Sequence, residues 1–260
     1  MMRWEELTSP EIGALDRMQT VVILPIGSVE QHGNHMPVGT DSLLAQAVSL
    51  EVAKVAENVV VLPPPWFGYS AHHMRFPGTI TLRPETLMAV AEDVVGSLVD
   101  HGFCRILIVN GHGGNGGVID LLASKLGHKH YGSARVATLT YFALARDAIA
   151  RQRKSVLGGM GHACEFETSL IQHLRPELVK IDRAETVYPD PGSSYLTTDL
   201  IGSQAVRVYH DFADLSPSGT LGDPSLASAE AGKIFFDASV QALADFIADF
   251  RGWSIPSGAP

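Results

Sequence analysis

The segment that decides the fold is TVVILPI, Thr20–Ile26, followed at once by GSVEQHGNHMPVGTD, Gly27–Asp41. The first part is a short, apolar, β-branched run, which is typical of a strand buried on both faces. The second part contains four side chains of metal-binding type: Glu30, His32, His35 and Asp41. The sequence therefore predicts a buried strand that ends directly in a group of candidate ligands.

Strand-like and helix-like patterns alternate along the rest of the chain. Strands are expected at 58–64, 105–110 and 134–141, and helices at 41–57, 83–102, 117–127, 164–174 and 223–250. This alternation predicts an α/β fold with a parallel sheet, helices on both faces, and ligands beyond the carboxyl ends of the strands. The irregular segment 188–223 is expected to form loops over one end of the sheet, within a single domain spanning residues 1–260.

The composition excludes several classes of protein. The chain has 260 residues, a formal net charge of -9 and no run of Lys or Arg, so it lacks the basic surface of a nucleic-acid or anionic-membrane binder. No apolar run reaches the roughly 18 residues that span a bilayer. Two isolated cysteines do not form a disulfide framework, and the N-terminus lacks the apolar core of a secretory signal. We expect a cytoplasmic protein.

Glu30, His32 and Asp41 form the first polar cluster. In an extended chain, Glu30 and His32 point to the same side and make a natural pair of metal ligands. Each residue also has a simpler interpretation, because Asp41 could cap the following helix and His32 could be an ordinary loop histidine. Taken with the second cluster, these residues are better explained as ligands, whereas His35 is expected in a solvent-facing or supporting position.

The second cluster is NGHGGNGG, Asn110–Gly117, between a strand and a helix. Its glycines fit the G-x-G-x-x-G dinucleotide fingerprint. However, the motif follows the third strand instead of the first, and the next strand ends without an acidic residue to hold a ribose. We therefore interpret His112 as a ligand supported by Asn115, and Gly113 and Gly114 as positions where the backbone approaches a substrate.

The third cluster is GGMGHACEFETSLIQHL, residues 158–174. On a helix, Glu167 shares the apolar stripe, and an acid there is costly unless it is paired or binds metal. Glu165 falls on the opposite, solvent-like side, which favours a solvated or supporting role. Cys164 beside His162 also permits a Cys/His nucleophile, but the sequence offers no third orienting group.

Five residues could thus converge at one end of the sheet: Glu30, His32, Asp41, His112 and Glu167. They outnumber the three protein ligands of a typical catalytic zinc and suit a two-metal site bridged by an aspartate. His162, which is not needed as a ligand, is suited to general acid/base catalysis.

The chain resembles the creatininase (creatinine amidohydrolase) family. The opening motif, NGHGGN and GHACEFETS carry the resemblance, together with GYSAHHMRFPGTITL at 68–82 and GTLGDPSLASAEAGK at 219–233. The resemblance implies a three-layer α/β/α fold with a mostly parallel central sheet, often assembled as a homo-hexamer. It also implies ligand roles for Glu30, His32, Asp41 and His112, with Asp41 bridging two divalent ions, either zinc with manganese or iron with zinc, and proton transfer by His162.

Two departures concern the substrate. Creatinine-hydrolysing members carry a ligand glutamate where this chain has Gly114, so we expect Glu167 to supply the missing ligand. Those members also use tryptophans near the third motif, and this chain has none near His162. By itself, HHMRFPGT (72–79) suggests surface histidines in a turn before a TITL strand, whereas the resemblance places His73 in the substrate pocket.

The leading hypothesis is a dinuclear metal-dependent hydrolase of a small cyclic amide or related C–N bond. One alternative keeps the metals and opens a keto-inositol (inosose-type) ring at a C–C bond. A further alternative is a nucleotide-binding oxidoreductase that uses the GHGGNG loop.

Overall fold

A computed structural model describes residues 2–202 and 206–257. Its central sheet has five parallel strands in the order β1-β3-β2-β4-β5. The strands are β1 Met2–Arg3, β2 Val21–Ile26, β3 Val59–Val61, β4 Arg105–Asn110 and β5 Arg135–Thr140. The four predicted strands are confirmed within a few residues, and the short edge strand β1 was not predicted.

The middle strands are buried on both sides. Every residue of β2 and β4 is buried. Along β2, Val21 and Ile23 pack into one hydrophobic cluster, while Val22 and Leu24 pack into a second cluster on the opposite face. This alternation follows from the two-residue period of a strand, and it explains why the run is apolar throughout.

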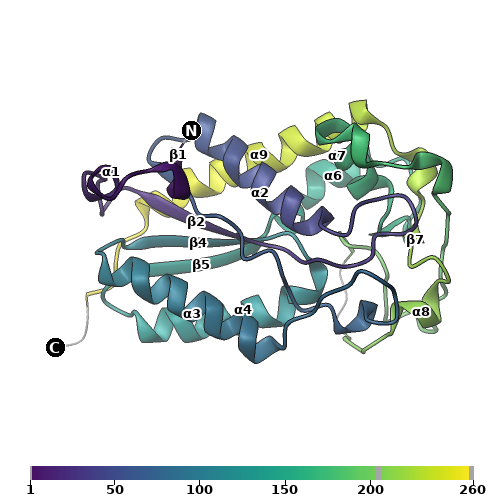
Figure 1. Cartoon of the computed structure of the whole chain (residues 1–260), viewed down its shortest axis with the longest axis horizontal. Helices are drawn as coiled ribbons and strands as arrows, with labels where there is room; N and C mark the ends of the chain where they lie inside the picture. The colour runs from purple at the N-terminus through teal and green to yellow at the C-terminus, as the bar shows by residue number, and fades with distance from the viewer. Residues whose placement is uncertain (1, 203–205, 258–260) are drawn as a thin grey trace.

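Helices cover both faces of the sheet (Figure 1). One face carries α2 Thr40–Val55, α7 Glu165–Leu174 and α9 Ala229–Gly252, and the other carries α3 Pro84–Asp100 and α4 Gly116–Lys129. The short helices α5 Tyr141–Leu144 and α6 Arg146–Gln152 also pack against α9. The predicted three-layer α/β/α architecture is confirmed.

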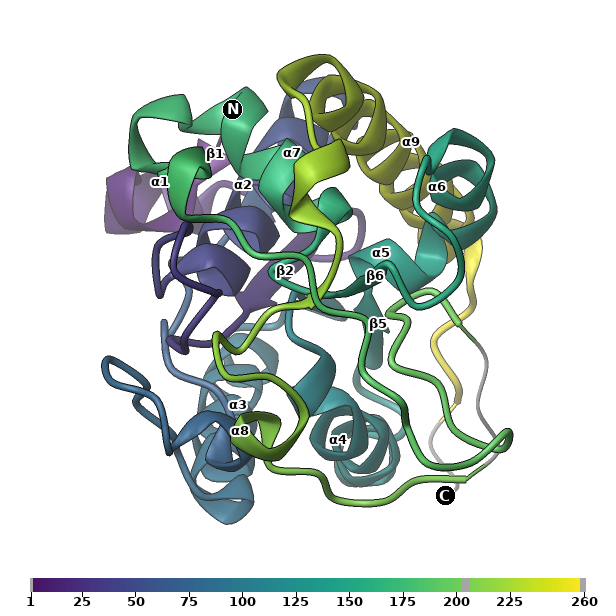
Figure 2. The same ribbon diagram turned by 90° about the vertical axis from the view of Figure 1, so that its right-hand side faces the viewer.

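The carboxyl ends of the central strands meet at one edge. Ile26 of β2, Asn110 of β4 and Thr140 of β5 are aligned in register. Figure 2 shows this end of the molecule, where the green loops cross in front of the sheet. Among its described residues, the predicted loop region at 188–223 contributes only α8 Phe212–Leu215 and β7 Leu221–Gly222. Strand β7 pairs antiparallel with β6 Met160–His162.

Two local expectations are wrong, and one alternative that the sequence left open is excluded. The excluded alternative is a cap role for Asp41, because α2 begins at Thr40 and Asp41 lies inside its first turn. The TITL segment makes only isolated bridges, Ile80 with Val29 and Thr81 with Gly68, because no neighbouring strand runs alongside it. The last helix begins at Ala229 with Ser228 as its cap, whereas Asp223 caps the short 3-10 helix Pro224–Leu226.

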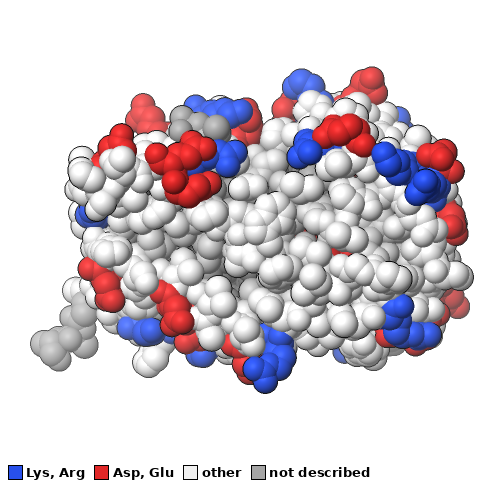
Figure 3. All heavy atoms as spheres, viewed as in Figure 1, with Lys and Arg blue, Asp and Glu red and all other residues white. Residues whose placement is uncertain are grey.

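The surface is mixed in charge. On the face in Figure 3, Lys and Arg side chains are interspersed with Asp and Glu around the rim, and the centre carries few of either. In the part of the chain that the structure describes, no helix combines the length and apolarity needed to cross a membrane. Cys104 and Cys164 are free and buried.

Candidate active site

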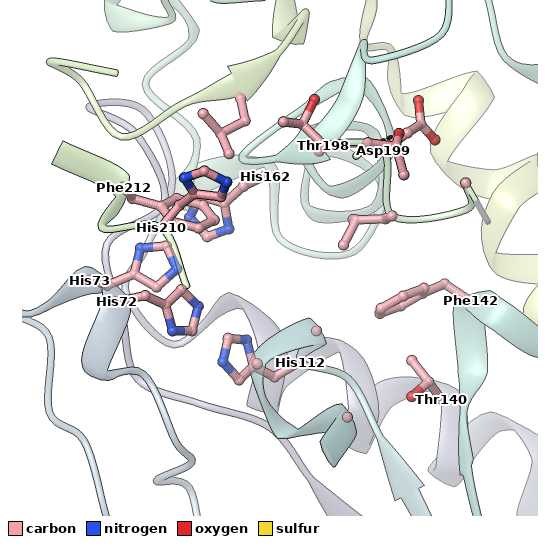
Figure 4. Close-up of a pocket in the computed structure, with 18 of the residues that line it drawn as sticks. His72, His73, His112, Thr140, Phe142, His162, Thr198, Asp199, His210 and Phe212 are labelled. Atoms are coloured by element: carbon pink, nitrogen blue, oxygen red, sulfur yellow. Dashed lines mark hydrogen bonds between the residues drawn. The ribbon is translucent and has the colours of Figure 1, made fainter. Parts of the chain in front are cut away.

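The five predicted ligands come together at the carboxyl edge of the sheet. Glu30 follows β2, Asp41 lies in the first turn of α2, His112 follows β4, and Glu167 lies in the first turn of α7. All are buried, as is His32. The fold thus brings the polar residues of three separate sequence motifs into one cluster, with His112 and His162 on the pocket wall shown in Figure 4.

Asp41 lies at the centre of two possible metal sites. Glu30, Asp41 and His112 form one group whose ligand atoms lie within 4.8 Å of one another, and His32, Asp41 and Glu167 form a second. Glu30 takes part in two further groups, one with His72 and His73 and one with His32 and His162. Because Asp41 belongs to both of the first two groups, it occupies the position that a bridging carboxylate needs.

Two carboxylate oxygens of this cluster, Glu30 Oε1 and Asp41 Oδ2, are buried and have no hydrogen-bond partner among the described residues. Glu30 Oε1 lies 3.2 Å from His73 Nε2, and Asp41 Oδ2 lies 3.0 Å from His112 Nδ1, but neither pair is aligned as a hydrogen bond. A buried carboxylate without partners is costly unless a cation lies beside it. The donor set therefore fits divalent metal.

Backbone carbonyls orient the two candidate ligand histidines. His32 donates its Nδ1–H to the Glu30 carbonyl at 3.1 Å, which turns Nε2 toward Asp41 Oδ1 at 3.2 Å and Glu167 Oε1 at 3.9 Å. His112 donates its Nε2–H to the Tyr69 carbonyl at 3.0 Å, which turns Nδ1 toward Asp41. Metal-binding histidines are commonly held in this way.

The carboxylates of the cluster raise the pKa values of two candidate ligand histidines, His32 and His112. Burial lowers the pKa of His32, but Asp41, Glu167 and Glu30 outweigh it and raise the pKa to about 10. Burial likewise opposes the charge of His112, and Glu30 with Asp41 raises its pKa to about 9. Both imidazoles are therefore protonated at neutral pH, and a divalent cation bound by them would have to displace these protons.

The two glutamates of α7 occupy different environments. Glu167 Oε2 accepts a hydrogen bond from the Ala163 amide at 2.6 Å, and its Oε1 faces His32. Burial raises the pKa of Glu167 to about 7. The prediction that Glu165 faces solvent is wrong. The Glu165 side chain is fully buried and accepts hydrogen bonds from the backbone amides of Lys154 and Ser155, each at 2.8 Å. Glu165 therefore holds a neighbouring loop.

His162, the predicted acid/base residue, lines the pocket. Its Nε2–H donates to the Gln31 carbonyl at 2.7 Å, and its Nδ1 lies 3.7 Å from Glu30 Oε1. Burial, followed by the positive charge of His32, lowers the pKa of His162 well below its ordinary value. The imidazole is therefore neutral and presents the lone pair of Nδ1 toward the carboxylates.

Two other candidates, His35 and Cys164, lie beside the site. His35 is buried and not solvent-facing, and its Nε2 hydrogen-bonds Thr168 Oγ1 at 2.9 Å. The Cys164 thiol is fully buried, and burial and Glu167 raise its pKa well above the ordinary value. A thiol that stays protonated is a poor nucleophile, which disfavours the Cys/His hypothesis.

The cluster opens into a cavity of about 610 Å³ that His73, Gly113 and Gly114 help to line. His73 is buried in the site and not on the surface. A Cβ at Gly114 would lie 2.3 Å from His112 Nε2 and 2.5 Å from His72 Cε1, so this position has no room for a side chain. The side chain of His72 instead stacks on His112, with ring centroids 5.6 Å apart.

Several supporting residues were not predicted. Ser70 Oγ donates to Glu30 Oε2 at 2.5 Å, and Phe212 packs against His73 with ring centroids 4.1 Å apart. Asn115, which was predicted to support the ligands, links two motifs. Its Nδ2 donates a hydrogen bond to the Gly27 carbonyl, and its Oδ1 accepts one from the Tyr69 amide. The SAHH sequence within the Gly68–Leu82 motif was an available signal for Ser70 and His72. Phe212 begins the one-turn helix α8, in a segment without a periodic sequence pattern.

Known proteins are similar to this chain along most of its length. The pattern of the Creatininase family, described as creatinine amidohydrolase, matches residues 5–247. A creatinine amidohydrolase of Pseudomonas putida is 32% identical over 240 residues, covering 87% of this chain and 88% of that protein. A mycofactocin precursor peptide peptidase of Mycolicibacterium smegmatis is 33% identical over 238 residues, covering 90% and 86%.

Two further similarities span nearly the whole chain. A 3-dehydro-scyllo-inosose hydrolase of Thermotoga maritima is 26% identical over 259 residues, covering 94% of this chain and 80% of that protein. A solved creatininase structure whose name specifies Mn superimposes with a TM-score of 0.80 at 32% identity, covering 95% of this chain and 98% of the other.

Proposed function

Because the chain belongs to the creatininase family of hydrolytic enzymes, we propose that it is a dinuclear metal-dependent hydrolase of a small cyclic amide or related C–N bond. One observation carries the proposal. Two groups of three buried ligand atoms share Asp41, and the carboxylates include oxygens without hydrogen-bond partners among the described residues. This arrangement suits two divalent cations joined by one carboxylate.

We assign Glu30 and His112 to one cation, His32 and Glu167 to the other, and Asp41 to both. In this assignment Glu167 replaces the ligand that the family pattern places at Gly114. Bound divalent cations would polarise a substrate carbonyl and lower the pKa of water. Zinc with manganese, or iron with zinc, is the pairing that we propose. The hexameric assembly and the cytoplasmic location remain predictions.

His162 is the proposed acid/base residue. Its Nε2–H is engaged by the Gln31 carbonyl, so the Nδ1 atom is the one that can accept a proton in the pocket and return it to a leaving nitrogen. His73, Gly113 and Gly114 line the same cavity and are the proposed substrate contacts.

We predict that His162→Ala lowers kcat by about 10²–10⁴-fold, the usual contribution of general acid/base catalysis. Bound metal should stay unchanged, because His162 is not among the assigned ligands. Steady-state kinetics and metal analysis on the same sample check both statements. A variant that loses its metal together with its activity would make His162 a ligand instead.

The pocket favours C–N substrates other than creatinine. A cavity of about 610 Å³ lies within the range of sites for drug-sized ligands. Its lining, among the residues that the structure describes, contains Phe142, Tyr209 and Phe212 but no tryptophan. Arg146 and Arg207 also line it and supply positive charge. Amides that carry a carboxylate are therefore the first substrates to test.

The alternative is hydrolytic opening of a keto-inositol ring at a C–C bond, which the similarity to the Thermotoga enzyme favours. A substrate panel separates the two functions. Cyclic amides, short peptides and keto-inositols should be incubated with metal-loaded protein and with protein stripped by a chelator. We expect metal-dependent cleavage of a C–N substrate. Cleavage of keto-inositols alone would support the alternative, and activity that survives complete metal removal would contradict both.

Metal should stabilise the protein more strongly as the pH rises. Without metal, the raised pKa values of His32 and His112 contribute stability that is present below their ordinary pKa of 6.5 and is lost as the pH rises toward 9–10. Glu167, with its pKa raised to about 7, also destabilises the fold as it ionises. In the metal-bound form His32, His112 and Glu167 would already be deprotonated, so its stability would not fall over this pH range.

The difference in melting temperature between zinc-loaded and chelator-treated protein should therefore widen from about pH 6 to about pH 8.5. Differential scanning calorimetry in buffers of equal ionic strength measures it. A difference that is constant or that narrows with rising pH would contradict the assignment of these imidazoles.

A further inference from the structure

Gln31 lies between two of the assigned ligands, and its side chain has a single consistent orientation. Its Oε1 accepts the Gly33 amide at 2.8 Å, and a backbone N–H can only donate. Its Nε2 lies 3.1 Å from the Gly219 carbonyl, which can only accept. Backbone groups at both ends therefore fix which atom of the amide is oxygen and which is nitrogen.

This orientation determines which nitrogen of His73 carries a proton. Gln31 Nε2 also lies 2.8 Å from His73 Nδ1. Because the amide nitrogen donates, Nδ1 must accept and has no proton. In the neutral imidazole the hydrogen is then on Nε2, and this atom lies 3.2 Å from Glu30 Oε1 inside the pocket.

His73 therefore differs from three neighbouring histidines whose hydrogen bonds also fix their ring orientation. His32, His112 and His162 each donate one N–H to a backbone carbonyl and turn the other nitrogen inward. His73 accepts a hydrogen bond from the side chain of Gln31 and turns an N–H inward. A ring nitrogen that carries a hydrogen has no free lone pair for a metal ion, but it can donate a hydrogen bond to an oxygen.

We propose that Gln31 is a positioning residue that makes His73 an N–H donor in the site and holds it out of metal coordination. The Nε2–H of His73 lies beside Glu30 Oε1 without a hydrogen-bond alignment to it, and it binds an oxygen of the substrate during the reaction. The substrate contact rests on the proposed hydrolase function, whereas the proton position does not depend on it.

Neutron diffraction of perdeuterated crystals tests the proton position directly, in both metal-free and zinc-loaded protein. We expect deuterium on His73 Nε2 and none on Nδ1. In Gln31→Glu the donor becomes an acceptor, so Nδ1 of His73 should gain deuterium. Each of three results would overturn the proposal. The first is deuterium on His73 Nδ1 in the unmodified protein, the second is zinc bound to His73 Nε2, and the third is an Nδ1 without deuterium in Gln31→Glu.

Substitutions of His73 test the role of the N–H. His73→Gln places an amide N–H near the position of Nε2, whereas His73→Asn and His73→Ala do not. Zinc titration should give the same stoichiometry for all three variants. On the C–N substrate that the panel identifies, kcat should fall by about 10–100-fold in the Asn and Ala variants and by clearly less in the Gln variant. Equal loss of activity in all three, or loss of zinc, would contradict the role.

These outcomes separate the inference from the proposed function. If Asp41 variants retain full metal and activity, the hydrolase mechanism fails, while the deuterium positions still test the action of Gln31 on His73. If the metal site is correct but His73 carries its proton on Nδ1, only the inference fails.

Discussion

Asp41→Ala should release both divalent ions and lower kcat by roughly 10³-fold or more, because the metals supply several kcal/mol of transition-state stabilisation. Asp41 is the residue shared by the Glu30–His112 group and the His32–Glu167 group. The isosteric Asp41→Asn should give nearly the same loss, since an amide cannot bridge two cations with two anionic oxygens. Metal analysis after gel filtration and steady-state kinetics measure the two effects.

The control for this loss is a carboxylate outside the site. Asp120 lies exposed on α4, and Asp120→Asn should keep full metal and full activity. Circular dichroism separates loss of metal from loss of the fold. If Asp41→Asn is folded and retains its metal and its activity, the shared-carboxylate assignment is wrong.

Glu167→Gln should weaken binding of one of the two cations by more than about 100-fold, since losing even an outer partner of a ligand costs 10–100-fold. The amide oxygen can still accept the Ala163 N–H, so the start of α7 should remain folded. What the variant loses is the negative charge that faces His32. Zinc titration followed by calorimetry should show one tight and one weakened site.

Glu165→Gln is the matched control, because it changes a buried glutamate two positions away on the same helix. Its two oxygens accept backbone amides of Lys154 and Ser155. Replacing one oxygen by an NH₂ group should lower the free energy of unfolding by about 1–3 kcal/mol and leave both metal sites intact. If Glu165→Gln weakens metal binding and Glu167→Gln does not, the two glutamates have been assigned in the wrong order.

The sequence predicted the architecture well because strand and helix patterns are local. The apolar β-branched runs of β2 and β4, and the Pro84 start and apolar periodicity of α3, are encoded in consecutive residues. Parallel strands then bring their carboxyl ends to one edge, which explains why residues far apart in sequence could be expected to meet.

Glu165 shows where helical periodicity fails. The prediction assigned one face of α7 to solvent, but every residue from Glu165 to Ile171 is buried. The helix packs along α9 on one side and receives the loop at 154–155 on another. A helix enclosed on all sides has no solvent face, and its sequence pattern cannot reveal this without knowledge of its neighbours.

His72 and Gln31 were missed for a related reason. The space that His72 fills depends on the absence of a side chain at Gly114, and the role of Gln31 depends on Gly219, 188 residues away. Such contacts follow from tertiary packing of loops, for which the sequence carries no periodic signal. His73 was placed in the pocket only through resemblance to a family.

The most direct test of the central claim is the number of divalent ions bound per chain. Protein stripped with a chelator, reloaded with zinc and freed of excess metal should contain two ions per chain by elemental mass spectrometry. The same measurement on Asp41→Asn should give a value near zero. Two ions in the unmodified protein and their loss in the variant would support the shared-carboxylate site. One ion or none in the unmodified protein would contradict it.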